Sequence, residues 1–88
     1  TATGTSVRIA ELLRPVLELG GVGVAAVHNH PSGDPAPSDE DVRLTSELLA
    51  ATRLLDIELL DHLVIGHDRW ASIRSLHGSI WGDAVERG

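Results

Sequence analysis

The stretch from His28 to Asp41 reads His-Asn-His-Pro-Ser-Gly-Asp-Pro-Ala-Pro-Ser-Asp-Glu-Asp. It follows an apolar run from Val22 to Val27, whose length and β-branched residues are typical of a buried strand. Residues two apart in a strand share one face, so we expect His28 and His30 to point the same way and Asn29 the opposite way. Two imidazoles on one side of a strand end are half of a metal site.

The segment after the histidines predicts a loop and then a helix. Prolines at 31, 35 and 37 exclude a helix up to that point, and Ser38 is typical of a helix N-cap. In a helix over residues 39–55, Asp41 falls at the end of the stripe that faces the core. That stripe contains Leu44, Leu48, Ala51 and Leu55, and the opposite side contains Glu40, Arg43, Glu47 and Arg53.

Two interpretations of Asp41 are open at this point. In the first, Asp41 completes a capping box by bonding the amide of Ser38, and the two histidines are surface residues. In the second, a cation lies between Asp41, His28 and His30 and removes the cost of an unpaired carboxylate near the core. Two histidines and one carboxylate leave one position of a tetrahedral zinc ion for water, as in catalytic zinc sites.

The same residues carry a resemblance to a known protein family. The order His-x-His, seven residues, Ser, two residues, Asp is the JAMM signature of the JAB/MPN metalloproteases. The whole stretch from 28 to 41, with Leu-Leu-Asp-His at 59–62 and Ile-Gly at 65–66, closely resembles the bacterial RadC-like branch of that family. The resemblance covers nearly the whole chain.

The resemblance implies an α/β domain of the cytidine-deaminase-like type, in which a central sheet is flanked by helices. It implies zinc as the cofactor, bound by His28, His30 and Asp41. It also implies a hydrolase that directs zinc-bound water at a peptide or isopeptide bond of a protein substrate. In that reaction Ser38 would hydrogen-bond the oxyanion or the bound water.

The sequence departs from the family pattern in its general base. The family has a glutamate on a strand upstream of the first helix, which by spacing should lie before Thr1. Glu11 and Glu18 fall within the first predicted helix and do not match that position. We therefore expect residues 1–88 to be a single RadC-like JAB/MPN domain without its N-terminal strands, which binds zinc but hydrolyses weakly or not at all. The missing strand also predicts an exposed sheet edge and a homodimer formed through it.

Two further hypotheses compete with the enzyme. One is a zinc-stabilised protein-interaction domain with no catalysis, in a protein that carries a DNA-repair type of name. The other is a structural fragment without metal, in which Asp41 only caps a helix. The enzyme needs the upstream glutamate, the interaction domain needs only zinc, and the structural fragment needs neither.

The composition of the chain limits the classes of protein and of function to which it can belong. The 88 residues predict one domain with a modest core. There is no cysteine, which excludes disulfides and thiol nucleophiles and fits a cytoplasmic protein. Neither a signal peptide nor an apolar run of membrane-spanning length is evident. The net charge is −6 and the seven basic residues, all arginine, are scattered, so no nucleic-acid partner is indicated.

The rest of the chain predicts the order helix, strand, helix, strand, strand. We expect a helix that Ser6 caps and that continues to about Leu19, kinked at Pro15 and ended by two glycines. Strands over 22–28 and 57–65 should pair in parallel around the second helix, and residues 70–74 should return antiparallel. Residues 75–88 are ambiguous, with a pattern of one short amphipathic helix that Gly78 and Gly82 weaken.

Asp61 and His62 are adjacent in the second predicted strand and should face opposite sides of the sheet. Both have apolar neighbours, so each needs a hydrogen-bond partner. Either they are hydrogen-bonded core residues, or one of them supports a zinc histidine from behind.

Overall fold

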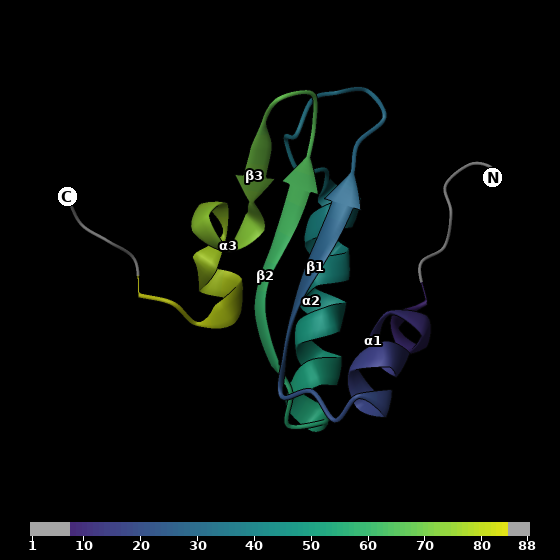
Figure 1. Cartoon of the computed structure of the whole chain (residues 1–88). Helices are drawn as coiled ribbons and strands as arrows, with labels where there is room; N and C mark the ends of the chain where they lie inside the picture. The colour runs from purple at the N-terminus through teal and green to yellow at the C-terminus, as the bar shows by residue number, and fades with distance from the viewer. Residues whose placement is uncertain (1–7, 85–88) are drawn as a thin grey trace.

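Two parallel strands and the helix that connects them form the centre of the molecule (Figure 1). The computed structural model describes residues 8–84. Strand β1 (Gly23–Asn29) pairs in parallel with β2 (Glu58–Ile65), and β3 (Trp70–Ser72) pairs antiparallel with β2. The strand order β1-β2-β3 places β2 in the middle, as its apolar residues on both faces predicted. The α/β class is confirmed.

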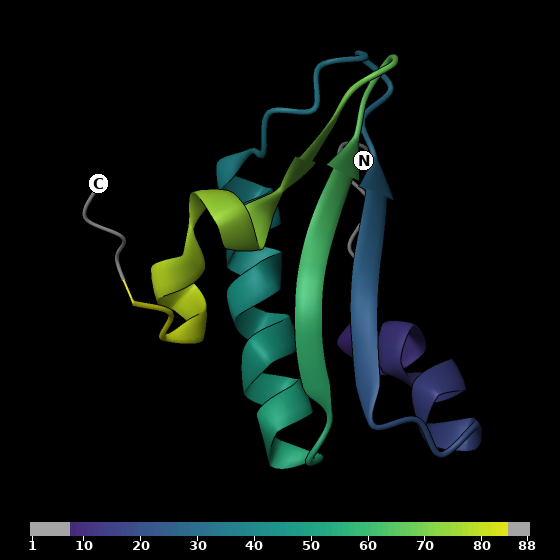
Figure 2. The ribbon, with the colours of Figure 1, turned by 60° about the vertical axis from the view of Figure 1, so that its left-hand side comes forward.

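Helix α2 (Asp39–Leu54) crosses from β1 to β2 along one face of the sheet, and α1 (Ile9–Glu18) packs beside it (Figures 1 and 2). The charged side of α2 is exposed, as its spacing predicted. A short helix α3 (Ile73–Leu76) and a 3-10 turn η1 (Gly78–Trp81) follow β3. Within residues 8–84, every helix is too short or too polar to cross a membrane.

The core lies between the sheet and the helices. Its buried apolar side chains come from the helices, the middle strand and η1: Leu13, Leu48, Leu49, Leu59, Val64, Ile73 and Trp81. The indole Nε1–H of Trp81 donates to the carbonyl of Leu59 at 2.8 Å, so this large side chain closes the core with its one polar atom paired. Trp81 therefore connects η1 to the middle strand β2.

The first helix differs from its prediction at one end. It begins at Ile9, because Arg8 has extended backbone angles and occupies the N-cap without a side-chain bond. Ser6, the predicted cap, lies outside the described residues. The helix continues through Pro15 as expected, and Gly20 ends it with φ of +67°.

The predicted strand over 70–74 is wrong for its last two residues. The Oγ of Ser72 accepts a hydrogen bond from the amide of Ser75 at 3.0 Å, which caps and starts α3 at Ile73. Within the described part of the ambiguous tail, α3 ends at Leu76 and η1 follows, and Gly82 ends η1 with φ of +84°. A local side-chain bond decided this boundary.

Candidate metal centre

Three side chains with metal-binding atoms converge where β1 ends and α2 begins. His28 and His30 come from the end of β1, and Asp41 comes from the first turn of α2. One ligand atom from each lies within 4.8 Å of the other two. The amide of His30 donates to the carbonyl of Ile65 at 2.9 Å, which extends the parallel pairing one residue past β1 and fixes this end of the strand.

The carboxylate of Asp41 serves the helix cap and the histidines together. Its Oδ2 accepts a hydrogen bond from the amide of Ser38 at 2.8 Å, and the Oγ of Ser38 accepts from the amide of Asp41 at 3.1 Å. Its Oδ1 lies 2.8 Å from Nδ1 of His28, and its Oδ2 lies 2.9 Å from Nε2 of His30. The capping box and the three-residue cluster are therefore compatible features of one site.

Asp41 is only 3% exposed, yet it carries its charge. Burial raises the pKa of Asp41, but hydrogen bonds from Ser38 act in the opposite direction, and the net effect holds the pKa below its usual value. An ionised, buried carboxylate facing two imidazoles is the electrostatic environment that a cation stabilises.

The hydrogen bonds of the His30 ring limit what can lie between this ring and Asp41. Its Nδ1 is 2.8 Å from the carbonyl oxygen of Asp34, which can only accept, so Nδ1 carries the hydrogen. In a neutral ring the other nitrogen, Nε2, then directs a lone pair at a carboxylate oxygen 2.9 Å away. Two acceptors at this distance require a proton or a metal ion between them.

The ring of His28 is a second indication that the residues fit a cation. Its Nδ1 is buried and 2.8 Å from Asp41, but the direction is unsuitable and it makes no hydrogen bond with any residue that the structure describes. Buried ring nitrogens normally have a partner. Two imidazole nitrogens and one carboxylate are ligands that zinc prefers, so the residues present fit this metal. The side chain of His28 is 42% exposed, which leaves one side of the cluster open to solvent.

The two remaining predicted residues lie on opposite faces of β2. The carboxylate of Asp61 accepts from the amide of His62 at 2.7 Å, the hydroxyl of Ser72 at 2.6 Å and the amide of Arg74 at 3.1 Å. It braces β2 against β3 and α3 and makes none of its hydrogen bonds to the metal cluster. His62 is 1% exposed and points toward α2, where its Nδ1 lies 2.7 Å from Oγ1 of Thr45.

Burial lowers the pKa of His62 below its ordinary value of 6.5, although the charges of Asp41 and Asp61 act in the opposite direction. The ring is therefore neutral near pH 7. A neutral ring in this position adds no positive charge beside the cluster, so it does not repel a cation bound there.

Sequence reasoning missed Thr45. Its hydroxyl donates to the carbonyl of Asp41 at 2.8 Å, and the side chain is fully buried. A threonine four residues after a candidate ligand, among the leucines of the apolar side of α2, was the available signal.

The loop between the histidines and α2 is clamped by the β2–β3 turn. The amide of His67 donates to the carbonyl of Gly33 at 2.8 Å. Gly33 has φ of +89°, and a Cβ at this position would lie 2.6 Å from Nδ1 of His67. Glycine is required here by backbone conformation and by the close approach of a ring.

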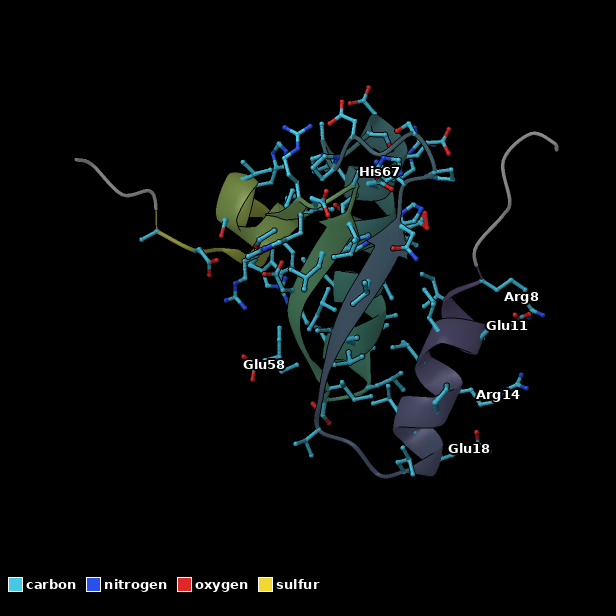
Figure 3. The ribbon with its side chains drawn as sticks, turned by 45° about the horizontal axis from the view of Figure 1, so that its top comes forward. Arg8, Glu11, Arg14, Glu18, Glu58 and His67 are labelled. Carbon is cyan, nitrogen blue, oxygen red and sulfur yellow. The ribbon has the colours of Figure 1, made fainter. Side chains whose placement is uncertain are left out.

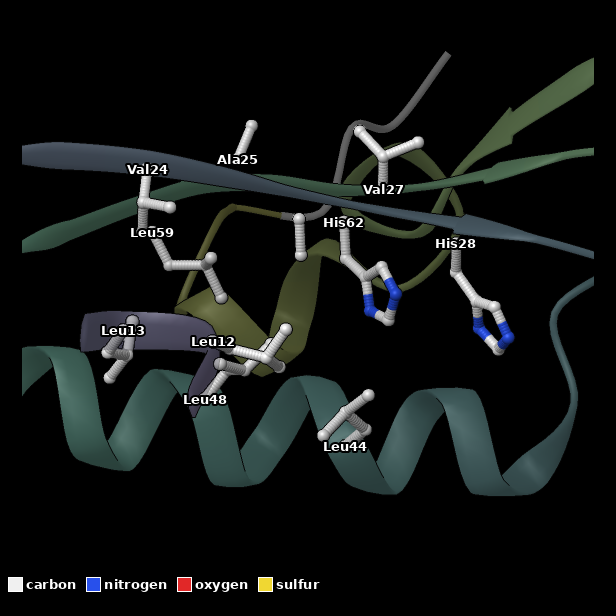
Figure 4. A pocket seen from close by; sticks show the side chains of 11 residues that line it. Leu12, Leu13, Val24, Ala25, Val27, His28, Leu44, Leu48, Leu59 and His62 are labelled. Carbon is white, nitrogen blue, oxygen red and sulfur yellow. The ribbon is translucent and has the colours of Figure 1, made fainter. Parts of the chain in front are cut away.

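An apolar cavity of about 250 Å³ lies between the sheet and α2 (Figure 4). His28 and His62 form one end of it, and leucines such as Leu44, Leu48 and Leu59 line the rest. The three candidate ligands therefore lie beside an apolar cavity through His28, whose side chain is also partly open to solvent.

Comparison with known proteins places these residues in a family context. The family model described as the RadC-like JAB domain matches residues 1–78. A UPF0758 protein of Roseiflexus castenholzii is 52% identical over 68 residues, which are 77% of this chain and 29% of that protein. A UPF0758 protein of Trichodesmium erythraeum is 43% identical over 88 residues, which are 100% of this chain and 36% of that protein. The chain thus spans about a third of the length of these relatives.

Proposed function

The chain belongs to the RadC-like JAB family, and we propose that His28, His30 and Asp41 bind one zinc ion in a hydrolase that cleaves peptide or isopeptide bonds. The observation that carries the proposal is the buried, ionised Asp41, which faces a ring nitrogen of each histidine without a suitable hydrogen bond to His28. Family membership supports the hydrolase class. The names of the relatives above state no reaction.

Each residue at the proposed site has a separate role in binding the metal. Asp41 supplies the negative charge, and its capping bonds with Ser38 fix it at the start of α2. The carbonyl of Asp34 fixes the tautomer and orientation of His30. A bound zinc ion would act as a Lewis acid and lower the pKa of a water molecule at its open position.

Ser38 is the residue that we assign to the developing oxyanion of the substrate. Its Oγ accepts from the amide of Asp41, and the single hydroxyl hydrogen remains to be donated. The side chain lies at the N-terminus of α2, where the helix dipole favours negative charge. A substrate carbonyl bound beside the cluster would receive this hydrogen bond as charge develops on its oxygen.

Neither glutamate of α1 is placed to act as the general base that the resemblance implies. Glu11 and Glu18 lie on the outer side of α1 and point away from the sheet (Figure 3). We therefore propose that a glutamate beyond the described residues takes the proton of the attacking water and passes it to the leaving amine. The chain alone is then expected to bind zinc and to hydrolyse slowly or not at all.

Zinc titration of the chelator-treated chain by calorimetry tests the metal site. We expect one zinc ion per chain, and loss of binding in His30→Ala and in Asp41→Ala. His67→Ala is a matched control, because His67 is an exposed histidine beside the same loop and is not a predicted ligand. A folded chain that binds no zinc, or variants that bind like the wild type, would overturn the proposal.

A second experiment separates the hydrolase from a zinc-stabilised interaction domain. The chain is joined to the segment that precedes the matching residues in the Roseiflexus castenholzii relative, and cleavage of a mixture of peptides is followed by mass spectrometry. The hydrolase predicts zinc-dependent cleavage that His30→Ala removes. Zinc binding without cleavage would favour the interaction domain.

A further inference from the structure

Thr45 connects a proposed metal ligand to a buried histidine. Its Oγ1 lies 2.8 Å from the carbonyl oxygen of Asp41 and 2.7 Å from Nδ1 of His62. The hydroxyl has one hydrogen and the carbonyl can only accept. Both contacts are therefore hydrogen bonds only when Thr45 donates to Asp41 and Nδ1–H of His62 donates to Thr45.

His62 also faces the other ligand-bearing element. It pairs with Ala26 in the parallel register of β1 and β2, and it is 1% exposed. Its ring is nearly parallel to that of His28, with an interplanar angle of 16° and 6.2 Å between the ring centroids. His62 thus reaches Asp41 through Thr45, and its ring lies beside that of His28 (Figure 4).

We propose that Thr45 and His62 are positioning residues that set the distance between the first turn of α2 and the end of β1. This inference rests on the proposed zinc site, because its effect is on the spacing of His28 and Asp41. The hydrogen bonds run from the middle strand to the backbone of the ligand helix, so they restrain that helix along its axis and toward the sheet. Partners that orient metal ligands in this way typically change metal affinity by about 10- to 100-fold.

The chain contains a matched control for this link. Thr52 lies on the same helix, is also 0% exposed, and donates to the carbonyl of Leu48 at 2.9 Å, the same type of bond to the residue four positions earlier. Replacing either threonine by valine removes one buried hydroxyl from α2. Only the change at Thr45 breaks the connection to His62 and to Asp41.

Zinc titration and the visible spectrum of the cobalt-substituted chain test the inference. We expect Thr45→Val to weaken zinc binding by about 10- to 100-fold and to shift the cobalt bands. Thr45→Ser keeps the hydroxyl and should restore both, whereas Thr52→Val should keep zinc affinity within about 3-fold. His62→Leu should match Thr45→Val, and the double variant should bind little worse than either single variant.

Each outcome has a distinct meaning. Equal zinc affinity and unchanged cobalt bands in Thr45→Val would overturn this inference and leave the proposed metal site intact. Equal weakening by Thr45→Val and Thr52→Val would also overturn it, because the effect would then follow helix stability. A wild-type chain that binds no zinc would overturn both this inference and the proposed function.

Discussion

Nε2 of His30 lies 2.9 Å from Oδ2 of Asp41, and the same carboxylate oxygen accepts the amide of Ser38 that begins α2. One side chain is thus a helix cap and the neighbour of a histidine ring nitrogen from another element. The cap positions the carboxylate with local backbone bonds, and the parallel strands bring the histidine to it. The site consequently depends on local helix geometry and on sheet pairing at once.

The two roles of Asp41 can be separated by Asp41→Asn. Asparagine retains an oxygen that can accept from Ser38 but has no charge, so we expect the free energy of unfolding without metal to change by less than about 1 kcal/mol. Zinc affinity should fall by at least about 100-fold, because the anionic ligand is lost. The matched control is Glu40→Gln, which neutralises an exposed carboxylate in the same helical turn. Equal zinc affinity in the two variants would contradict the assignment.

The buried ring of His62 predicts how stability depends on pH. Because burial lowers its pKa in the folded state, the unfolded chain binds more protons below the ordinary value of 6.5. Its contribution is therefore fully present above pH 6.5 and is lost as the pH falls toward the folded-state pKa. We expect the urea midpoint of the chelator-treated chain to be lower at about pH 5.5 than at about pH 7.5.

In His62→Leu the urea midpoint should change less between the two pH values than in the wild type. His77→Gln, which changes an exposed histidine, is the control and should behave like the wild type. Urea unfolding of the three proteins at both pH values provides the comparison. An unchanged slope in His62→Leu would show that other groups cause the loss of stability.

Gly33→Ala tests the clamp on the metal loop. The substitution places a Cβ 2.6 Å from the ring of His67 at a residue with φ of +89°. Gly82→Ala is matched in backbone conformation, with φ of +84° and no atom within 4 Å of the new Cβ. We expect Gly82→Ala to cost about 1 kcal/mol and Gly33→Ala to cost more, with weaker zinc binding only in Gly33→Ala.

The double change Gly33→Ala with His67→Ala removes the ring that the new methyl group meets. Its stability in urea should approach that of Gly82→Ala, because only the backbone cost then remains. If the double variant is as unstable as Gly33→Ala alone, the clash with His67 does not explain the requirement for glycine.

Asp61→Ala should reduce stability without affecting metal affinity. The change leaves the hydroxyl of Ser72 and the amide of Arg74 without their acceptor, which costs about 1–3 kcal/mol for each buried donor. Zinc affinity, measured at a temperature where the variant is folded, should stay within about 3-fold of the wild type because Asp61 makes none of its bonds to the cluster. A large loss of zinc affinity would assign Asp61 to the metal site.

We also propose that the chain forms a homodimer through β1. Within the described part of the chain, β1 pairs with β2 alone and so has one free edge. Sedimentation at increasing concentration should show a mass that rises toward that of a dimer, and Ala25→Lys, at an exposed position of β1, should oppose it. A monomer at every concentration would contradict the proposal.

The central parts of the site could be predicted from the sequence, because they follow from local rules. The apolar run, the three prolines and Ser38 placed a strand, a loop and a helix start, and α2 indeed begins at Asp39. The strand spacing then predicted two imidazoles on one face of the strand end, and the helix spacing predicted one carboxylate on the core-facing side of the helix. Local patterns left the choice between cap and ligand for Asp41 open, because both use the same position of a helix.

Only the tertiary structure decided which residues support the site. Alternation shows that Asp61 and His62 face opposite sides but gives no information on which side α2 covers. That depends on the packing of α2 and on the register shift between Val24 and Ala25, which together direct His62 toward Thr45. The start of α3 at Ile73 follows the local cap by Ser72, and the hydroxyl of Ser72 also donates to Asp61 of the neighbouring strand. Such pairings join residues far apart in sequence, where periodicity carries no information.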